Sequence, residues 1–339
     1  MNKFENEIDI NTISNLPFFF IIGRPRSGTT LLRYLFDAHP NVIIPTECNF
    51  ILSLAGRYQN KKEFDKQTLT KFFTDLRQTR FFETLSIDTN LLEKRILDID
   101  KNIKYQTLCK IVSSSYISLN TKKDVKIIGD KNPSYSSENF HKIFQLFPDA
   151  KFIHLIRDYH DHIVSMQKGN FKLPSAAYMA ILWKKSIRIL AKYKKKKPEN
   201  FFTIKYETFV ENPEFHMKDI CQFLELPFDK EMFEFITKKE NHEALQPNID
   251  FSKQHQSLFK PIDKSRIGKW SILLTGNDLA AVEIVAGKTG KEFGYEYSQH
   301  KLKLRILFLL IKCHLLNFIV IILRGFIYSL SVKSKIASQ

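Results

Sequence analysis

Short apolar runs, each ending in a polar turn, recur along the chain and predict buried strands. The expected strands are Phe18–Ile22, Asn41–Ile44, Val125–Pro133, Lys151–Asp158 and Phe201–Tyr206. Between them, apolar positions three and four residues apart predict helices, among them 29–38, 159–168 and 175–197. Alternation of this kind is typical of right-handed βαβ units and a parallel sheet, which binds ligands at the carboxyl ends of its strands. We therefore expect an α/β fold with a central parallel sheet flanked by helices.

The same pattern divides the chain into a core and its additions. Residues 1–16 are a polar lead-in, and 17–296 hold the expected α/β domain. Within it, 47–120 read as a mostly helical insertion that covers the sheet or forms a substrate wall. A late helix, 277–286, is expected to end at Gly287. Residues 297–339 form a separate basic and hydrophobic tail that predicts a C-terminal helix.

Composition narrows the class of partner. The formal net charge is +16, which favours anionic partners such as phosphates, sulfates or an acidic membrane face. We find no nucleic-acid-binding motif, so nucleic acid is not an expected partner. The four cysteines show neither CxxC spacing nor paired histidines, which predicts free thiols in a reducing compartment and no metal site. We expect a cytoplasmic protein; the cysteines are Cys48, Cys109, Cys221 and Cys313.

The turn after the first strand, GRPRSGTT, has the chemistry of an anion-binding loop. Its G-x-x-x-x-G spacing is that of a P-loop, but Thr29 stands where a nucleotide hydrolase has the Lys that reaches the outer phosphates. Backbone N–H groups at a helix N-terminus, three hydroxyls and the cations Arg24 or Arg26 still suit a phosphate or sulfate. The loop predicts an anion site that disfavours ATP or GTP hydrolysis.

The run RSGTTLLRYLFDAHPNV resembles the sulfotransferases that use 3′-phosphoadenosine 5′-phosphosulfate (PAPS), above all protein-tyrosine sulfotransferases and their bacterial carbohydrate and small-molecule relatives. The resemblance implies a P-loop-containing nucleotide-transferase-like fold and PAPS as co-substrate, with no metal. It assigns the 5′-phosphosulfate to the loop, and Arg26 also to catalysis. The residues concerned are Arg26, Ser27, Gly28, Thr29 and Thr30.

Later motifs extend this resemblance over about 275 residues, in chain order. In LIRDYHDHIVSM, it assigns the 3′-phosphate to Arg157 and Ser165. In GDKNP, it implies that Lys131 stabilises charge at the sulfuryl group, although a solvated Lys in a turn is the simpler interpretation. Tyr206 resembles a tyrosine near the nucleotide. A loop over the 3′-phosphate is implied by RIGKW, with Arg266, Gly268 and Lys269.

Sulfuryl transfer to a hydroxyl group needs a base for the acceptor proton. Glu47 in IPTECNF falls where the tyrosine-sulfotransferase pattern has its catalytic carboxylate, and its alternative role is to cap the following helix. The neighbours Thr46 and Cys48 depart from that pattern. Histidines are weaker candidates. We expect His154 inside a strand, His160 and His162 at solvated helix positions, and His39 capping the carbonyls of a helix end.

The tail 301–339 contains no acidic residue and seven Lys or Arg residues. Its apolar part, 304–330, is interrupted by Lys312, His314, Asn317 and Arg324, so no uncharged run reaches the length of a spanning helix. Three interpretations stay open: an amphipathic helix at an anionic membrane surface, which would place the protein peripherally at the inner face, a helix packed on the core, and a single-span anchor, which the interrupting residues disfavour.

We therefore expect a PAPS-dependent sulfotransferase that acts on a hydroxyl acceptor: a glycan, glycolipid, small molecule or tyrosine. One alternative is a kinase-like P-loop phosphotransferase, which the absent Lys disfavours. The other is a non-enzymatic basic protein that binds anions or membranes.

Overall fold

The structure, a computed structural model, describes residues 9–100, 102–118, 120–169, 175–237, 262, 264–298 and, further on, 304, 306–308, 311, 312 and 315. The chain divides into two compact units. Unit 1 comprises 1–157 and 189–264, and unit 2 comprises 158–188 and 265–339. Cys313 and most of the predicted tail 297–339 lie outside the described residues.

Unit 1 is built on a five-stranded sheet in which every pairing is parallel, with the strand order β2-β3-β1-β4-β5. The strands are β1 (Phe18–Ile22), β2 (Val42–Ile43), β3 (Ile127–Lys131), β4 (Lys151–Ile156) and β5 (Phe201–Lys205). This confirms all five predicted strands, most of them shorter than expected. After β1 the chain continues to β2 at one edge of the sheet, and after β4 it continues to β5 at the opposite edge. The loops after β1 and β4 therefore lie at the point where parallel sheets of this kind bind ligands.

The apolar run of β1 is explained by burial on both faces of the sheet. Phe18, Phe20 and Ile22 belong to the main hydrophobic core, where Phe20 stacks on Phe152 of β4 at 5.7 Å between ring centroids. Phe19 faces the other way and packs on Phe36 of α2 (Thr29–Ala38) at 5.0 Å. A strand that is covered on both faces has a continuous run of apolar residues in its sequence, instead of alternating apolar and polar residues.

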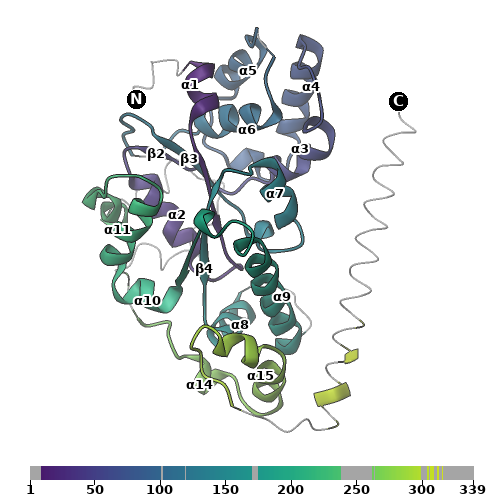
Figure 1. Cartoon of the computed structure of the whole chain (residues 1–339), viewed down its shortest axis with the longest axis vertical. Helices are drawn as coiled ribbons and strands as arrows, with labels where there is room; N and C mark the ends of the chain where they lie inside the picture. Colours follow the sequence, from purple (N-terminus) through teal and green to yellow (C-terminus); the bar gives the residue numbers. More distant parts are fainter. Residues whose placement is uncertain are drawn as a thin grey trace. The chain divides into compact units, whose positions relative to one another are not determined.

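The insertion 47–120 is mostly helical, as predicted, and its helices contact one another (Figure 1). They are α3 (Phe50–Tyr58), α4 (Lys66–Arg77), η1 (Phe82–Thr84), α5 (Thr89–Leu97) and α6 (Tyr105–Ser114). Besides α2 and these helices, unit 1 also contains α1 (Ile10–Asn15), η2 (Pro133–Ser136), α7 (Phe140–Leu146), η3 (Pro198–Asn200), α10 (Tyr206–Glu211), α11 (Pro213–Phe223) and η4 (Lys230–Thr237). The apolar faces of α3, α4 and α6 enter the same core as β1, so the insertion is an integral part of unit 1.

Unit 2 contains α8 (Tyr159–Lys168), the first part of α9 (Ala176–Lys194), α14 (Trp270–Leu273) and α15 (Gly276–Lys291). The prediction that the last helix ends at Gly287 is wrong, because Gly287 and Gly290 both lie inside α15. A Cβ atom at either would overlap an aromatic ring, that of Tyr297 or Tyr159, so these glycines permit close packing rather than ending the helix. Among the described residues, none of the helices combines the length and apolarity that membrane crossing requires.

Candidate functional site

The loop after β1 turns sharply through left-handed backbone before α2 begins. Arg26 has φ +70°, and Gly28, the N-cap of α2, has φ +94°. A Cβ at Gly23 would lie 2.7 Å from Thr29 Cγ2 and 2.8 Å from the Leu155 carbonyl oxygen. Glycine is required at 23 by this close approach and favoured at 28 by the positive φ. The predicted loop thus leads into the N-terminus of a ten-residue helix, where unpaired N–H groups attract anions.

Residues from two other strand ends lie against this loop. Arg157, directly after β4, donates from Nη1 to the Arg26 carbonyl oxygen at 2.9 Å. The Tyr206 ring covers Gly28, where a Cβ would stand 2.7 Å from a ring atom, and the Arg157 guanidinium lies 4.6 Å from the ring centroid. The structure therefore brings together Arg26, Gly28, Arg157 and Tyr206, which the sequence had placed in three separate motifs.

A second group joins β3 to the first turn of α2. Lys131 donates from Nζ to Thr30 Oγ1 at 3.2 Å and pairs closely with Glu47 Oε1. The Lys131 side chain is 3% exposed, whereas that of Glu47 is 37% exposed. The simpler interpretation of Lys131 as a solvated Lys in a turn is wrong, because it is the last residue of β3 and is buried. The capping alternative for Glu47 also fails, since the N-cap of α3 is Asn49 and the first turn of α3 has no acidic residue.

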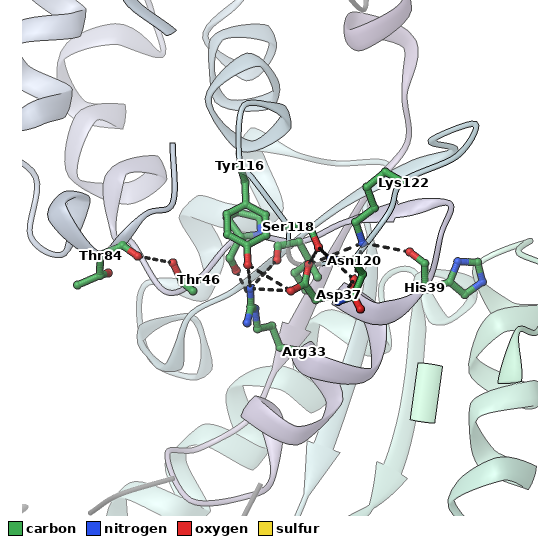
Figure 2. A network of polar contacts seen from close by, with 11 residues as sticks. Arg33, Asp37, His39, Thr46, Thr84, Tyr116, Ser118, Asn120 and Lys122 are labelled. Atoms are coloured by element: carbon green, nitrogen blue, oxygen red, sulfur yellow. Dashed lines mark hydrogen bonds and ion pairs between the residues drawn. The ribbon is translucent and has the colours of Figure 1, made fainter. Parts of the chain in front are cut away.

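A buried polar network that sequence reasoning missed surrounds Arg33 and Asp37 of α2 (Figure 2). Arg33 of α2 is 2% exposed and donates to the carbonyl oxygens of Ile44 at 3.1 Å and Pro45 at 3.2 Å, as well as to the Tyr116 hydroxyl at 2.7 Å. Ile44 and Pro45 belong to the segment that leads to Glu47. Arg33 therefore ties that segment to α2, the helix that follows the loop 23–30, and no sequence pattern indicated this role.

The same network joins α2 to the chain after α6. Asp37 lies 3.5 Å from Arg33 Nη2, and Lys122 Nζ lies 3.7 Å from Asp37 Oδ1. Lys122 also donates to the carbonyl oxygens of Asp37 and His39. Burial lowers the pKa of Lys122 to about 8, although the Asp37 carboxylate opposes this effect. Two cations thus share one carboxylate, and backbone carbonyls and the Tyr116 hydroxyl are their further acceptors.

Ser27 and Thr29 of the loop are buried in unit 1, and the remaining predicted residues lie in unit 2. Ser165 is half-buried on α8, while Gly268 and Lys269 are exposed in the loop before α14 and Arg266 is half-buried there. This loop is fixed to α8 by Asp161, which sequence reasoning also missed. The pairing of Ser165 with Arg157, which belongs to unit 1, remains a prediction.

The histidines behave differently from expectation. His154 lies in β4 as predicted, and burial lowers its pKa to about 3, so it is neutral and unsuited to binding an anion through a charged ring. His160 and His162 are fully buried, so the prediction of solvated positions is wrong. His39 is the C-cap of α2, as predicted, and its backbone N–H donates to the Phe36 carbonyl oxygen at 3.1 Å. The cap is made by the backbone, because the ring lies 2.8 Å from the Pro227 carbonyl oxygen and 3.1 Å from the backbone nitrogen of Asn41.

Comparison with known proteins agrees with this geometry. A sequence model of the Sulfotransferase family matches residues 17–230, more than half of the chain. Protein-tyrosine sulfotransferase A of Caenorhabditis elegans is 25% identical over 292 residues, which cover 83% of this chain and 67% of that protein. Protein-tyrosine sulfotransferase 1 of Danio rerio is 23% identical over 267 residues, covering 76% and 66%. The chain thus spans about two thirds of the length of these relatives.

A solved structure shows the same fold. The sulfotransferase domain of the Synechococcus PCC 7002 olefin synthase aligns with a TM-score of 0.55 at 21% identity, covering 83% of this chain and 96% of that one. This likeness confirms the predicted α/β fold. The family match confirms the resemblance found in the loop motif and the expectation of a sulfotransferase enzyme. By its matched residues and by its fold, the chain belongs to the Sulfotransferase family.

Proposed function

We propose that this protein transfers a sulfuryl group from PAPS to a hydroxyl acceptor, with Glu47 as the base. The observation that carries the proposal is the contact between Glu47, Lys131 and Thr30 at the first turn of α2. A carboxylate that is partly exposed can accept a proton from a bound hydroxyl group, and the buried ammonium beside it is held in place to face developing negative charge.

The phosphate loop supplies the donor side of this reaction. Two residues in left-handed conformation turn the backbone toward the N-terminus of α2, and Ser27 and Thr29 are buried beside it. These groups fit the 5′-phosphosulfate by donor chemistry: N–H groups, hydroxyls and the Arg26 cation. A sulfuryl group carries less charge than a phosphoryl group. We therefore propose that Arg26 and Lys131 take the place that a metal ion holds in phosphoryl transfer.

For the other end of PAPS, we keep the assignment that the resemblance implies. Arg157 and Ser165 bind the 3′-phosphate, Tyr206 lies near the nucleotide, and Arg266, Gly268 and Lys269 form the closing loop. The contact of Arg157 with the Arg26 carbonyl supports a role for Arg157 close to the phosphate loop.

The base assignment is tested with Glu47→Gln, which keeps the shape of the side chain and removes the proton acceptor. We expect turnover to fall at least 100-fold, within the range of general-base catalysis, while 3′-phosphoadenosine 5′-phosphate (PAP) binds as before. Glu83→Gln is the matched control, because Glu83 is an exposed carboxylate of the same helical insertion. If Glu47→Gln retains turnover within a few-fold, Glu47 is not the base.

The donor assignment is tested separately by thermal unfolding. PAP should stabilise the protein, whereas ATP with magnesium should stabilise it much less. Equal stabilisation by ATP would favour the kinase-like alternative, and no shift with PAP would remove the PAPS proposal.

We propose a hydroxyl group as the acceptor, in line with tyrosine in the relatives' names. The two positions that depart from the tyrosine-sulfotransferase pattern serve the helical insertion. Thr46 Oγ1 donates to the Thr84 carbonyl oxygen at 3.1 Å, and Cys48 Sγ lies 3.6 Å from the Arg80 carbonyl oxygen.

We further propose that the C-terminal segment binds an anionic membrane surface, which would be the inner face for a cytoplasmic protein. Ile306 is 1% exposed and packs in a cluster with residues of α9 and α15. Its neighbours follow a helical spacing and are 41–73% exposed: Leu304, Leu307, Phe308, Ile311 and Leu315. Such a stripe, in a tail of seven cations and no acidic residue, suits a headgroup region.

Vesicle flotation tests this association. The protein should float with phosphatidylcholine vesicles only when they contain phosphatidylglycerol. Leu304→Gln with Phe308→Gln should abolish flotation while leaving Ile306 in place. The proposal would be contradicted if the double variant still floats, or if the protein with the natural sequence does not float.

A further inference from the structure

The loop that leads into α14 is held by one carboxylate of α8. The backbone N–H of Gly268 donates to Asp161 Oδ2 at 2.6 Å, and that of Trp270 donates to Oδ1 at 3.0 Å. Asp161 is 2% exposed. Both oxygens therefore accept backbone donors from the RIGKW loop, and charge-assisted hydrogen bonds of this kind are short and strong.

The Trp270 side chain gives the loop a second attachment. Its indole stacks on the His160 ring at 4.1 Å between centroids and 16° between planes. The two His160 nitrogens lie 3.0 Å from carboxylate oxygens, Nδ1 from Asp158 and Nε2 from Glu283 of α15. A ring fixed at both nitrogens is a rigid platform, so Trp270 and the end of the loop have a defined position.

These attachments place the loop relative to Ser165. Asp161 and Ser165 are four residues apart in α8, so they lie on the same face one turn from each other. The loop that Asp161 holds carries the cations Arg266 and Lys269. Gly268 provides the bend: its φ is +73°, and a Cβ there would meet no atom within 4 Å. The loop's path therefore depends on backbone conformation and on Asp161, and not on packing around Gly268.

We infer that Asp161 is a positioning residue that sets the affinity for the 3′-phosphate of the donor by holding the 266–270 loop beside Ser165. This inference rests on the proposed function, because it takes PAPS as the donor. Asp161 itself does not meet the phosphate, since both of its oxygens are occupied by backbone N–H groups. Its carboxylate accepts hydrogen bonds from the loop, and the loop carries the cations Arg266 and Lys269.

The test compares two nucleotides that differ only at the 3′ position, PAP and AMP, by calorimetric titration. Asp161→Asn keeps the shape of the side chain but replaces one acceptor oxygen with an NH₂ group. We expect the affinity for PAP to fall about tenfold, as one charge-assisted hydrogen bond is lost, with AMP affinity unchanged. In turnover, the KM for PAPS should rise by a similar factor and kcat should stay within about twofold. Asp278→Asn, an exposed acidic residue in the first turn of α15, is the matched control.

Gly268→Ala provides an independent variant in case Asp161→Asn disturbs folding, because it strains the bend without a clash. It should weaken PAP binding in the same selective way. Equal losses for PAP and AMP, or no loss with either variant, would overturn the inference. If the natural sequence binds PAP no better than AMP, the proposed donor site itself fails.

Discussion

Asp130, the residue before Lys131 on β3, is a carboxyl group that should cost stability at neutral pH. It is 1% exposed, and burial raises its pKa to about 7, although hydrogen bonds from the Tyr135 hydroxyl and the Lys131 backbone N–H act in the opposite direction. An unfolded Asp has a pKa of about 3.9. Between these values the folded chain binds the proton and the unfolded chain does not, so stability falls as pH rises.

The size of the effect follows from the two pKa values. Their difference of about 3 corresponds to about 4 kcal/mol in the free energy of unfolding, of which about 3 kcal/mol falls between pH 5 and 8.5. Asp130→Asn removes this titration and preserves the shape of the site. The amide oxygen can accept from the Lys131 N–H, and the amide NH₂ can donate to the Tyr135 hydroxyl.

The assay is urea unfolding of both proteins at a series of pH values, followed by far-UV circular dichroism. Groups that the proteins share cancel in the difference between their free energies of unfolding. That difference should move in favour of Asp130→Asn by about 3 kcal/mol from pH 5 to 8.5. A difference that stays constant with pH would refute the reasoning, because it would mean that Asp130 is ionised in the folded chain throughout this range.

Two further substitutions test the scaffold around the site. Arg33→Met leaves Asp37 with one cation fewer and should lower the free energy of unfolding by about 3–5 kcal/mol. Tyr116→Phe removes one hydroxyl of the same network and should lower it by about 1–2 kcal/mol. If urea unfolding gives similar losses for the two variants, Arg33 is not the central residue of the network. Gly28→Ala should weaken PAP binding at least tenfold in calorimetric titration, because alanine is strained at φ +94° and its Cβ would overlap the Tyr206 ring. Unchanged PAP affinity would show that the loop does not need this backbone conformation. Gly56→Ala is its control, since Gly56 lies within α3 with nothing within 4 Å of a Cβ.

Much of the fold could be predicted because its causes are local. Five consecutive apolar residues indicate that β1 is buried on both faces of the sheet. The helix α2 begins at Thr29 and ends at Ala38, as its sequence predicted. Gly287 misled the prediction of α15, because glycine ends a helix in most contexts, but here it makes room for the ring of Tyr297. Such a contact joins residues whose proximity no periodicity reveals.

In the candidate site too, some residues could be predicted from the sequence and others only from the structure. The loop residues were recognisable since Gly, Ser, Thr and Arg at this spacing have few other uses between a strand and a helix. Glu47 could be proposed, but its competing role as a cap was removed only by the structure, in which Asn49 is the N-cap of α3 and Glu47 contacts Lys131, 84 residues away along the chain. Asp161 and Arg33 gave no signal, because Asp and Arg are ordinary residues of a helix surface.

The sequence by itself determined the parallel α/β architecture and the anion chemistry of the loop from Gly23 to Thr30, because strand burial and phosphate binding depend on neighbouring residues. Only the tertiary structure decided what stands around that loop. In the structure, Lys131 contacts Glu47, and Arg33 joins the segment before Glu47 to α2. Asp161 holds the RIGKW loop through hydrogen bonds to its backbone. Each of these contacts depends on charged groups that burial brings within hydrogen-bonding distance, and burial is a property of the packed chain.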